Sequence, residues 1–199
     1  MVSLSKGQGL KLEKSMNLCL VGLGWDPNED GDLYEDVDFD LDLSVFMLDS
    51  TGRVRSEKDF VFFGNQVHAS GSVRSFGDDR TGENSEEGDD EKVLIDFSKI
   101  PSYVDWLAIT VSIYDEEETG LTFSDLTNAY VRVVKVRKPT DEDGEEVVRY
   151  DLDFEFEEEN AMVACEIVRN GSEWKFVAVG AGYDCGLEGL CEKYGVDVG

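Results

Sequence analysis

The segment 77–91, which reads GDDRTGENSEEGDDE, concentrates side chains that could hold a hard cation. Eight of its fifteen residues are acidic, one is basic, and three glycines interrupt the run. Calcium takes about six to eight oxygen ligands from carboxylates, carbonyls and water. Glycines let the backbone curl and turn carbonyls inward, so the composition is typical of a calcium loop. The alternative is a solvated acidic loop, because runs of charge usually face water.

A second acidic pattern, DVDFDLDLS, spans 36–44 and alternates strictly between acidic and apolar residues. Such alternation predicts a half-buried strand, which continues to the turn at Ser50-Thr51-Gly52. Three carboxylates, those of Asp38, Asp40 and Asp42, would then lie on one face of one strand. They would repel one another strongly unless a cation or a lysine faced them.

A third candidate, DPNEDGD at 26–32, matches the front half of an EF-hand loop. The match then fails, because position twelve is Val37 where a bidentate glutamate is required, and the flanking residues are typical of strands. We therefore reject an EF-hand, although Asp26 could still reach a shared site. Soft ligands are scarce, which argues against zinc, copper or iron.

Composition limits the class of protein. The 199 residues suffice for one domain spanning 1–199, with 41% hydrophobic and 11% aromatic residues to form a core. The net charge of -27 makes nucleic acid or an anionic membrane surface an unfavourable direct partner. A further acidic segment, 141–159, has eleven acids and one arginine, and we expect it to face solvent.

Cysteine and histidine usage excludes several chemistries. The four cysteines form no CxxC pair, and the single histidine, His68, is expected on the surface or in a loop rather than as a ligand or base. The amino-terminal segment has no apolar core of a secretory signal, and no apolar stretch approaches the length of a membrane span. We expect a cytoplasmic protein with free thiols, and Cys19 buried in a strand.

Most of the chain follows a period of two. Short strand-like runs separated by Gly, Asp and Asn turns predict a mainly all-β fold, an antiparallel β-sandwich. Asn170-Gly171 and Asp143-Gly144 are the clearest turn signals, and 187–194 predicts one short C-terminal helix ended by Gly195. Single helical turns are expected near 97–103 and 123–128, and the three tryptophans are expected in the core.

Several motifs in order resemble the TerD family of tellurium-resistance and stress-response proteins. They are VSLSKGQGLKL, VGLGWD, DFDLDLSVFML, GDDRTGE, GDDE, KIPSYVDWLAITVSIYD and the closing GSEWKFVAVGAGYDCGLEGLCEKYGVDVG. The resemblance runs nearly end to end. The central loop departs from the family's common GDNRTGEGDGDDE, because Asp79 replaces an asparagine and the inner part is two residues longer.

The resemblance implies a β-sandwich that binds Ca2+, commonly two ions, through acidic loops at one end. It also implies a non-enzymatic protein that works with other Ter-type stress proteins at the inner face of the membrane, without inserting into it. By motif, the resemblance implies the following ligand set: Asp26, Asp38, Asp40, Asp42, Asp78, Asp79, Thr81, Gly82, Glu83, Asp89, Asp90 and Glu91.

Two other functions stay open from the residues. A metal-dependent phosphohydrolase could use the Asp/Glu cluster to hold two ions and activate water. Arg80 is the one basic anchor in the central loop for a phosphate, which argues against this reading. The other alternative is an acidic decoy surface for basic proteins that needs no metal.

Overall fold

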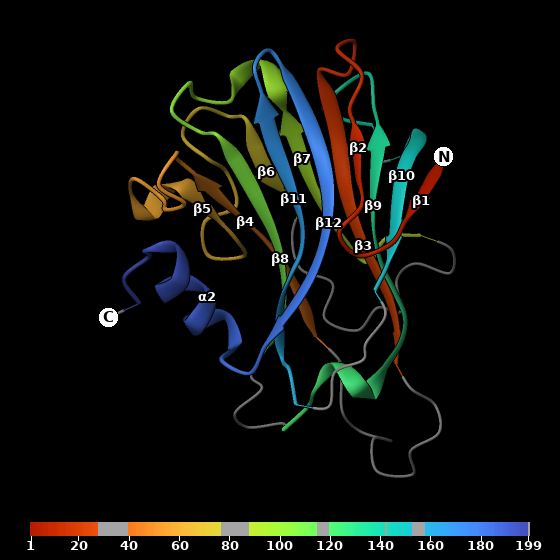
Figure 1. Ribbon diagram of the computed structural model, residues 1–199, viewed down its shortest axis with the longest axis vertical. Coiled ribbons are helices and arrows are strands. Elements are labelled where there is room, and N and C mark those ends of the chain that lie inside the picture. Colours follow the sequence, from red (N-terminus) through yellow and green to blue (C-terminus); the bar gives the residue numbers. More distant parts are fainter. Residues whose placement is uncertain (28–39, 77–87, 115–119, 142, 153–157, 199) are drawn as a thin grey trace.

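The computed structural model describes residues 1–27, 40–76, 88–114, 120–141, 143–152 and 158–198. They form two facing six-stranded sheets with one helix outside them (Figure 1). The first sheet has the order β1-β10-β9-β3-β7-β6, and the second has the order β2-β12-β11-β8-β4-β5. This arrangement confirms the predicted sandwich with a short C-terminal helix. Among the described strand pairs, one departs from the antiparallel expectation, because β1 runs parallel to β10.

The strands of the first sheet, in the order given above, are Val2–Leu4, Glu145–Asp151, Leu126–Lys135, Leu18–Pro27, Glu91–Asp96 and Val73–Ser75. Those of the second sheet, again in spatial order, are Gly9–Lys11, Glu173–Tyr183, Ala161–Asn170, Trp106–Ile113, Leu41–Leu48 and Phe60–Val61. Helix α2 covers Gly186–Tyr194. Single 3-10 turns lie at Glu57–Asp59, Phe97–Lys99 and Phe123–Asp125.

Local signals in the sequence fix several of these boundaries. The turn after Asn170 joins β11 to β12, with Gly171 in the left-handed region at a φ of 63°. Helix α2 ends at Gly195, whose φ of 84° lets its amide reach back to the carbonyls of Cys191 and Glu192. Both glycines adopt a conformation that costs other residues free energy, so these predictions are confirmed for a physical reason.

The main core lies between the two sheets. Inward-facing aliphatic side chains of both sheets form it, including Val21 and Leu23 from β3 and Leu43 and Val45 from β4. Burying each such side chain contributes about 1.5–3 kcal/mol. Cys19 belongs to this core and is a free thiol, as predicted, and burial raises its pKa well above the usual range.

A second core lies on the outer face of the second sheet, where α2 packs (Figure 1). Phe46 and Leu48 from β4 meet Leu190 and Tyr194 there. All eight residues of β4 are buried, so the prediction of a half-buried strand is wrong for this part of the pattern. The helix covers the outer face of this strand at Phe46 and Leu48.

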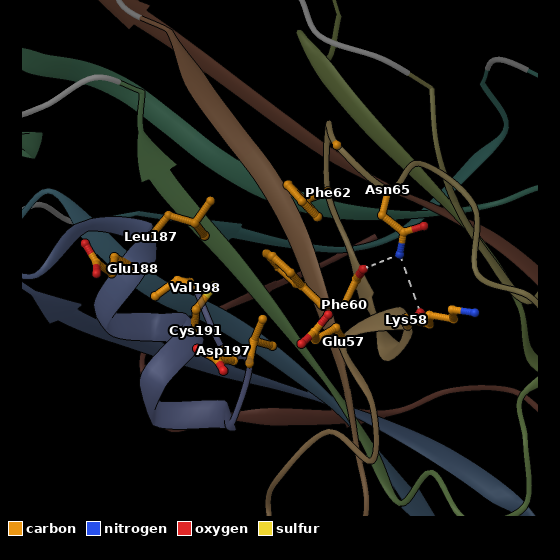
Figure 2. A pocket seen from close by; sticks show the side chains of 12 residues that line it. Glu57, Lys58, Phe60, Phe62, Asn65, Leu187, Glu188, Cys191, Asp197 and Val198 are labelled. Carbon is orange, nitrogen blue, oxygen red and sulfur yellow. Dashed lines mark hydrogen bonds between the residues drawn. The ribbon is translucent and has the colours of Figure 1, made fainter.

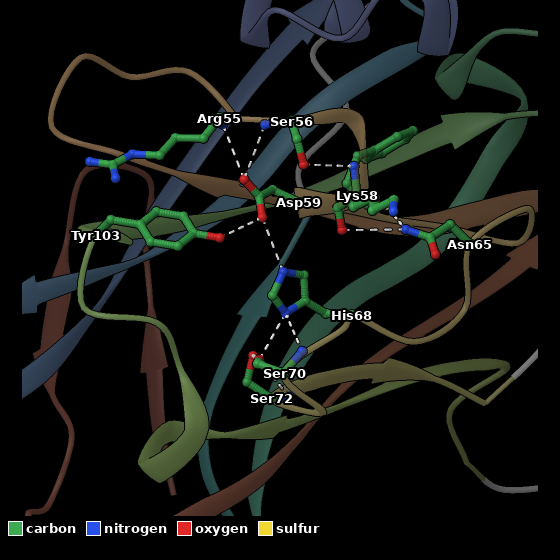
Figure 3. Close-up of polar contacts among 10 residues, drawn as sticks. Arg55, Ser56, Lys58, Asp59, Asn65, His68, Ser70, Ser72 and Tyr103 are labelled. Carbon is green, nitrogen blue, oxygen red and sulfur yellow. Dashed lines mark hydrogen bonds and ion pairs between the residues drawn. The ribbon is translucent and has the colours of Figure 1, made fainter.

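His68 was expected on the surface or in a loop, and it does lie in a loop, but it is only 5% exposed. Its Nε2 lies 3.0 Å from Oδ1 of Asp59, and its Nδ1 accepts the amide hydrogen of Ser70 at 3.2 Å (Figure 3). Asp59 also accepts hydrogen bonds from the Tyr103 hydroxyl at 2.7 Å and from the amides of Arg55 and Ser56. The network ties the segment after β4 to the loop before β6. The expectation of a surface histidine is corrected, because a buried carboxylate needs donors and His68 supplies one.

Two of the three tryptophans lie in the core as predicted, with Trp25 and Trp174 buried, while Trp106 is partly exposed. Within the described part of the chain, helices are too short and too polar to cross a membrane.

Candidate metal centre

Three strands bring acidic residues to one end of the sandwich. Strand β3 finishes there at Asp26 and Pro27, and β7 begins beside it with Glu91 opposite Leu23. Strand β4 begins in the other sheet at Leu41, between Asp40 and Asp42. Antiparallel pairing places the end of one strand beside the start of the next, which is why residues far apart in sequence meet here.

Asp90 links the start of β7 to the end of β3. Its Oδ2 accepts the amide hydrogen of Trp25 at 3.0 Å, and its own amide donates to the carbonyl of Leu23 at 2.8 Å. The pairing of β3 with β9 shifts register between Gly24 and Asp26, so Trp25 sits at an irregularity in that ladder. Such bulges re-aim side chains and are frequent beside functional sites. The Asp90 carboxylate therefore lies next to the backbone that carries Asp26.

Glu91 links the first sheet to the second. Although it is charged it is only 5% exposed, and one carboxylate oxygen accepts the amide hydrogen of Leu43. This amide is available because the short strand β5 pairs with β4 only at Val45 and Phe46. The Glu91 carboxylate therefore lies next to the backbone that carries Asp42.

Asp26 is exposed and accepts a hydrogen bond from Nδ2 of Asn128 at 3.0 Å. Asn128 has a φ of 52°, in the left-handed region. Asparagine tolerates this conformation better than most residues, but it still costs free energy, and such residues cluster at functional sites. Here the unusual backbone accompanies a side chain that orients the Asp26 carboxylate.

Asp40 and Asp42 lie at the start of β4, with Asp40 half-buried and Asp42 5% exposed. The carbonyl of Asp40 accepts the amide hydrogen of Tyr114 at 2.8 Å, which fixes the entry of the strand. Ser112 on β8 lies directly across from Asp42, and its hydroxyl is buried with no hydrogen-bond partner among the described residues. An unsatisfied buried hydroxyl beside a buried carboxylate fits a site that receives a further polar group.

Asp89 has a different environment. Its two oxygens accept hydrogen bonds from Arg132 on β9, with Nε 2.6 Å from Oδ1 and Nη2 3.0 Å from Oδ2. The Tyr130 hydroxyl also donates to Oδ1, at 3.2 Å. The Asp89 hydrogen bonds raise the pKa of Arg132, while burial, followed by the charge of Asp89, raises that of Tyr130 to about 12. Glycine is required at position 22, because a Cβ there would lie 2.2 Å from Cγ of Asp89.

Arg132, Asn128 and Ser112 were missed by the sequence analysis. Arg132 carried a usable signal, since a basic residue in the middle of an apolar strand needs a buried carboxylate as its partner. Asn128 and Ser112 carried none, because their roles depend on the register between strands.

The other sequence-predicted ligands lie outside the described residues: Asp38, Asp78, Asp79, Thr81, Gly82 and Glu83. In the described ranges, no three His, Cys, Asp or Glu side chains are grouped closely enough to hold a metal by themselves. The candidate donors at this end of the sandwich are carboxylate and hydroxyl oxygens, and oxygen ligands are those that calcium and magnesium prefer.

Comparisons with known proteins agree with this architecture. The TerD domain profile matches residues 1–194. Tellurium resistance protein TerD of Serratia marcescens is 43% identical over 200 residues, covering 98% of each chain. General stress protein 16U of Bacillus subtilis (strain 168) is 41% identical over 202 residues, covering 100% of this chain and 99% of that protein. The crystal structure of a TerD homologue from Streptomyces coelicolor A3(2) has a TM-score of 0.65 at 21% identity, covering 86% of this chain and 93% of that one, and this likeness concerns the fold alone.

Proposed function

This chain belongs to the TerD family of tellurium-resistance and stress-response proteins, and we propose that it is a calcium-binding, non-enzymatic interaction module of that response. The observation that carries the proposal is the convergence of Asp26, Asp90 and Glu91 with the start of β4 at one end of the sandwich. Asp40 and Asp42 stand at that start. In this proposal the protein works in the cytoplasm with other Ter-type stress proteins.

The residues at this end of the sandwich fit a hard cation. Asp26, Asp40, Asp42, Asp90 and Glu91 would supply carboxylate oxygens, and Ser112 would add a hydroxyl or hold a bound water. A bound calcium supplies positive charge that offsets carboxylate repulsion and fixes the strand ends relative to one another. With a formal net charge of -27, the protein has much repulsion to offset.

Thermal unfolding after exhaustive chelation, followed by titration with calcium or magnesium at constant ionic strength, tests the metal. Calcium at a hundredfold excess over Kd stabilises the folded state by about 2.7 kcal/mol. We expect a large rise in Tm with micromolar calcium and a small rise with magnesium. Equal small shifts with both ions would mean charge screening alone and would overturn the calcium site.

A separate assay tests the absence of catalysis. Phosphatase and nuclease substrates are incubated with the protein and Mg2+ or Mn2+, and we expect no turnover above the chelated control. Turnover that disappears in Asp42→Asn would instead support the phosphohydrolase alternative.

A further inference from the structure

An apolar groove lies on the side of the molecule that carries α2 (Figure 2). It has a volume of about 590 Å3 and runs between the helix with the residues after it and the segment around β5. This size lies within the range of about 300–1,000 Å3 that is typical of ligand-binding pockets. The apolar lining consists of Phe60, Phe62, Leu187, Cys191, Val196 and Val198.

The floor of the groove is a stack of aromatic rings. The Phe46 ring stacks on that of Phe60 with centroids 4.1 Å apart, and Phe60 stacks on Phe62 at 4.4 Å. On the buried side, Tyr194 of α2 packs against Phe46 at 4.8 Å. The second core therefore holds these rings in place, and a groove with a fixed floor loses little conformational entropy when a partner binds.

The same row of rings continues out to the surface. Phe63 meets Phe62 edge-on at 5.0 Å, and Tyr114 meets Phe63 at 6.0 Å. Phe63 is 45% exposed and Tyr114 is 47% exposed. Phe63 and Tyr114 therefore extend the apolar surface beyond the groove, and Val198 in the groove lining is itself 46% exposed. Such an open apolar surface is expected of a protein-binding site more than of a closed pocket for a small molecule.

The rim of the groove is acidic. Glu57, Glu188 and Asp197 line it, and Lys58 is the one basic residue in the lining. An acidic rim around an apolar floor favours a partner that places basic residues beside apolar anchors. A second copy of this chain would bring the same carboxylates and a net charge of -27, and an anionic membrane would be repelled as well.

We propose that this groove, with Phe63 and Tyr114 beyond it, binds a peptide segment of a partner protein that carries apolar or aromatic anchors flanked by Lys or Arg. The anchors insert between Phe62 and Leu187, and the basic flanks face Glu57 and Glu188. This deepens the interaction role under Proposed function, but it does not depend on the metal, because none of the candidate metal ligands lines the groove.

Selection from a phage library of random dodecapeptides on the immobilised wild-type protein, with and without calcium, tests the proposal. We expect enriched sequences to combine one or two aromatic or aliphatic anchors with Lys or Arg on either side. The selected peptide is then synthesised with a fluorescent label, and its Kd is measured by anisotropy. Enrichment of no sequence, or of sequences without basic flanks, would overturn the proposal.

Variants locate the binding site. Val198→Asp changes an exposed groove residue, and we expect it to weaken peptide binding about tenfold or more, because a carboxylate would be desolvated against the anchor. Glu188→Gln should weaken it by about two- to five-fold, the effect of one partly exposed ion pair. Glu192→Gln, the same change on the same helix but outside the groove lining, should leave Kd unchanged.

The peptide-binding groove and the calcium site can be contradicted independently of each other. If the peptide binds equally well in chelator and in calcium, the groove is supported whatever the metal titration gives. If Val198→Asp, with an unchanged Tm, binds the peptide as tightly as the wild type, the peptide sits elsewhere and the groove is not the docking site.

Discussion

The guanidinium of Arg132 holds both oxygens of the Asp89 carboxylate, with Nε 2.6 Å from Oδ1 and Nη2 3.0 Å from Oδ2. The side chain of Asp89 is 1% exposed and that of Arg132 is 16% exposed, so the pair is largely withdrawn from water. Arg132 also reaches Glu146 on β10 at 3.1 Å. The pair thus connects the segment that enters β7 to the middle of the first sheet.

Removal of the arginine should be costly. In Arg132→Met the Asp89 charge would stay buried without its partner, and we expect the free energy of unfolding to fall by about 3–5 kcal/mol. Urea unfolding at neutral pH measures the change. Lys11→Met breaks an exposed ion pair with Glu173 and should leave the urea midpoint nearly unchanged. Similar midpoints for the two variants would show that the buried pair contributes little.

A methyl group added at position 22 tests how closely Gly22 packs against the Asp89 carboxylate of the same pair. In Gly22→Ala the new Cβ would overlap the Asp89 carboxylate, so we expect a loss of about 1–3 kcal/mol from overpacking. Asp89→Ala removes the overlapping atoms, and the cost of Gly22→Ala should be much smaller in that background. A double-mutant cycle by urea unfolding gives the coupling free energy. Additive losses would mean that the two side chains do not compete for this space.

Much of the fold follows from local signals in the sequence. The alternating runs, the Asn170-Gly171 turn and the closing helix with Gly195 depend on neighbours in the chain, and they are found where predicted. Burial of the outer face of β4 was not predictable in this way. It depends on α2, which follows it by more than a hundred residues and packs on Phe46 through Tyr194.

The residue types of the candidate site could be predicted from the sequence, but the role of each residue could not. Asp89, Asp90 and Glu91 were predicted to share one role as metal ligands. In the structure they have three different partners, which are Arg132, the Trp25 amide and the Leu43 amide. Those partners come from three strands, and only the register between the strands decides which carboxylate meets which group. The burial of His68 in its loop was not predictable for the same reason, because Asp59 and Tyr103 come together only in the folded chain.

The different partners lead to a prediction for calcium affinity. Asp42→Asn and Asp90→Asn should each weaken calcium binding about tenfold or more, since each removes a charge from the proposed cage. Asp89→Asn should lower Tm but leave the calcium Kd within about twofold, because Arg132 already holds both Asp89 oxygens. Isothermal titration of chelated protein gives the Kd values.

The matched control for these variants is Asp151→Asn. Asp151 is an exposed carboxylate paired with Arg149 on the same strand, so it should leave both Kd and Tm unchanged. An equal loss of affinity in Asp151→Asn would indicate a general charge effect. A large loss of calcium affinity in Asp89→Asn alone would indicate that Asp89 is a calcium ligand.

Alkaline unfolding tests the network around Asp59. Burial, and next the Asp59 carboxylate, raise the pKa of Tyr103 to about 12 from a usual value of 10. The folded state therefore holds this proton more tightly than the unfolded state. The resulting stabilisation is fully present below pH 10 and is lost as the pH rises towards 12. Tyr103→Phe removes this contribution and the 2.7 Å hydrogen bond to Asp59, so we expect a lower free energy of unfolding at pH 7 by about 1 kcal/mol and a shallower decline at alkaline pH.

The measurement is urea unfolding of the wild type and Tyr103→Phe at several pH values from 9 to 12. Tyr130, whose pKa is also raised to about 12, contributes to the alkaline decline in the free energy of unfolding of both proteins. The quantity to compare is therefore the difference between the two slopes. Tyr114→Phe changes an exposed tyrosine on the aromatic row and should follow the wild-type slope. If Tyr103→Phe also follows that slope, the Tyr103 hydroxyl does not donate to Asp59 in solution, and the buried carboxylate depends on His68 and the two backbone amides alone.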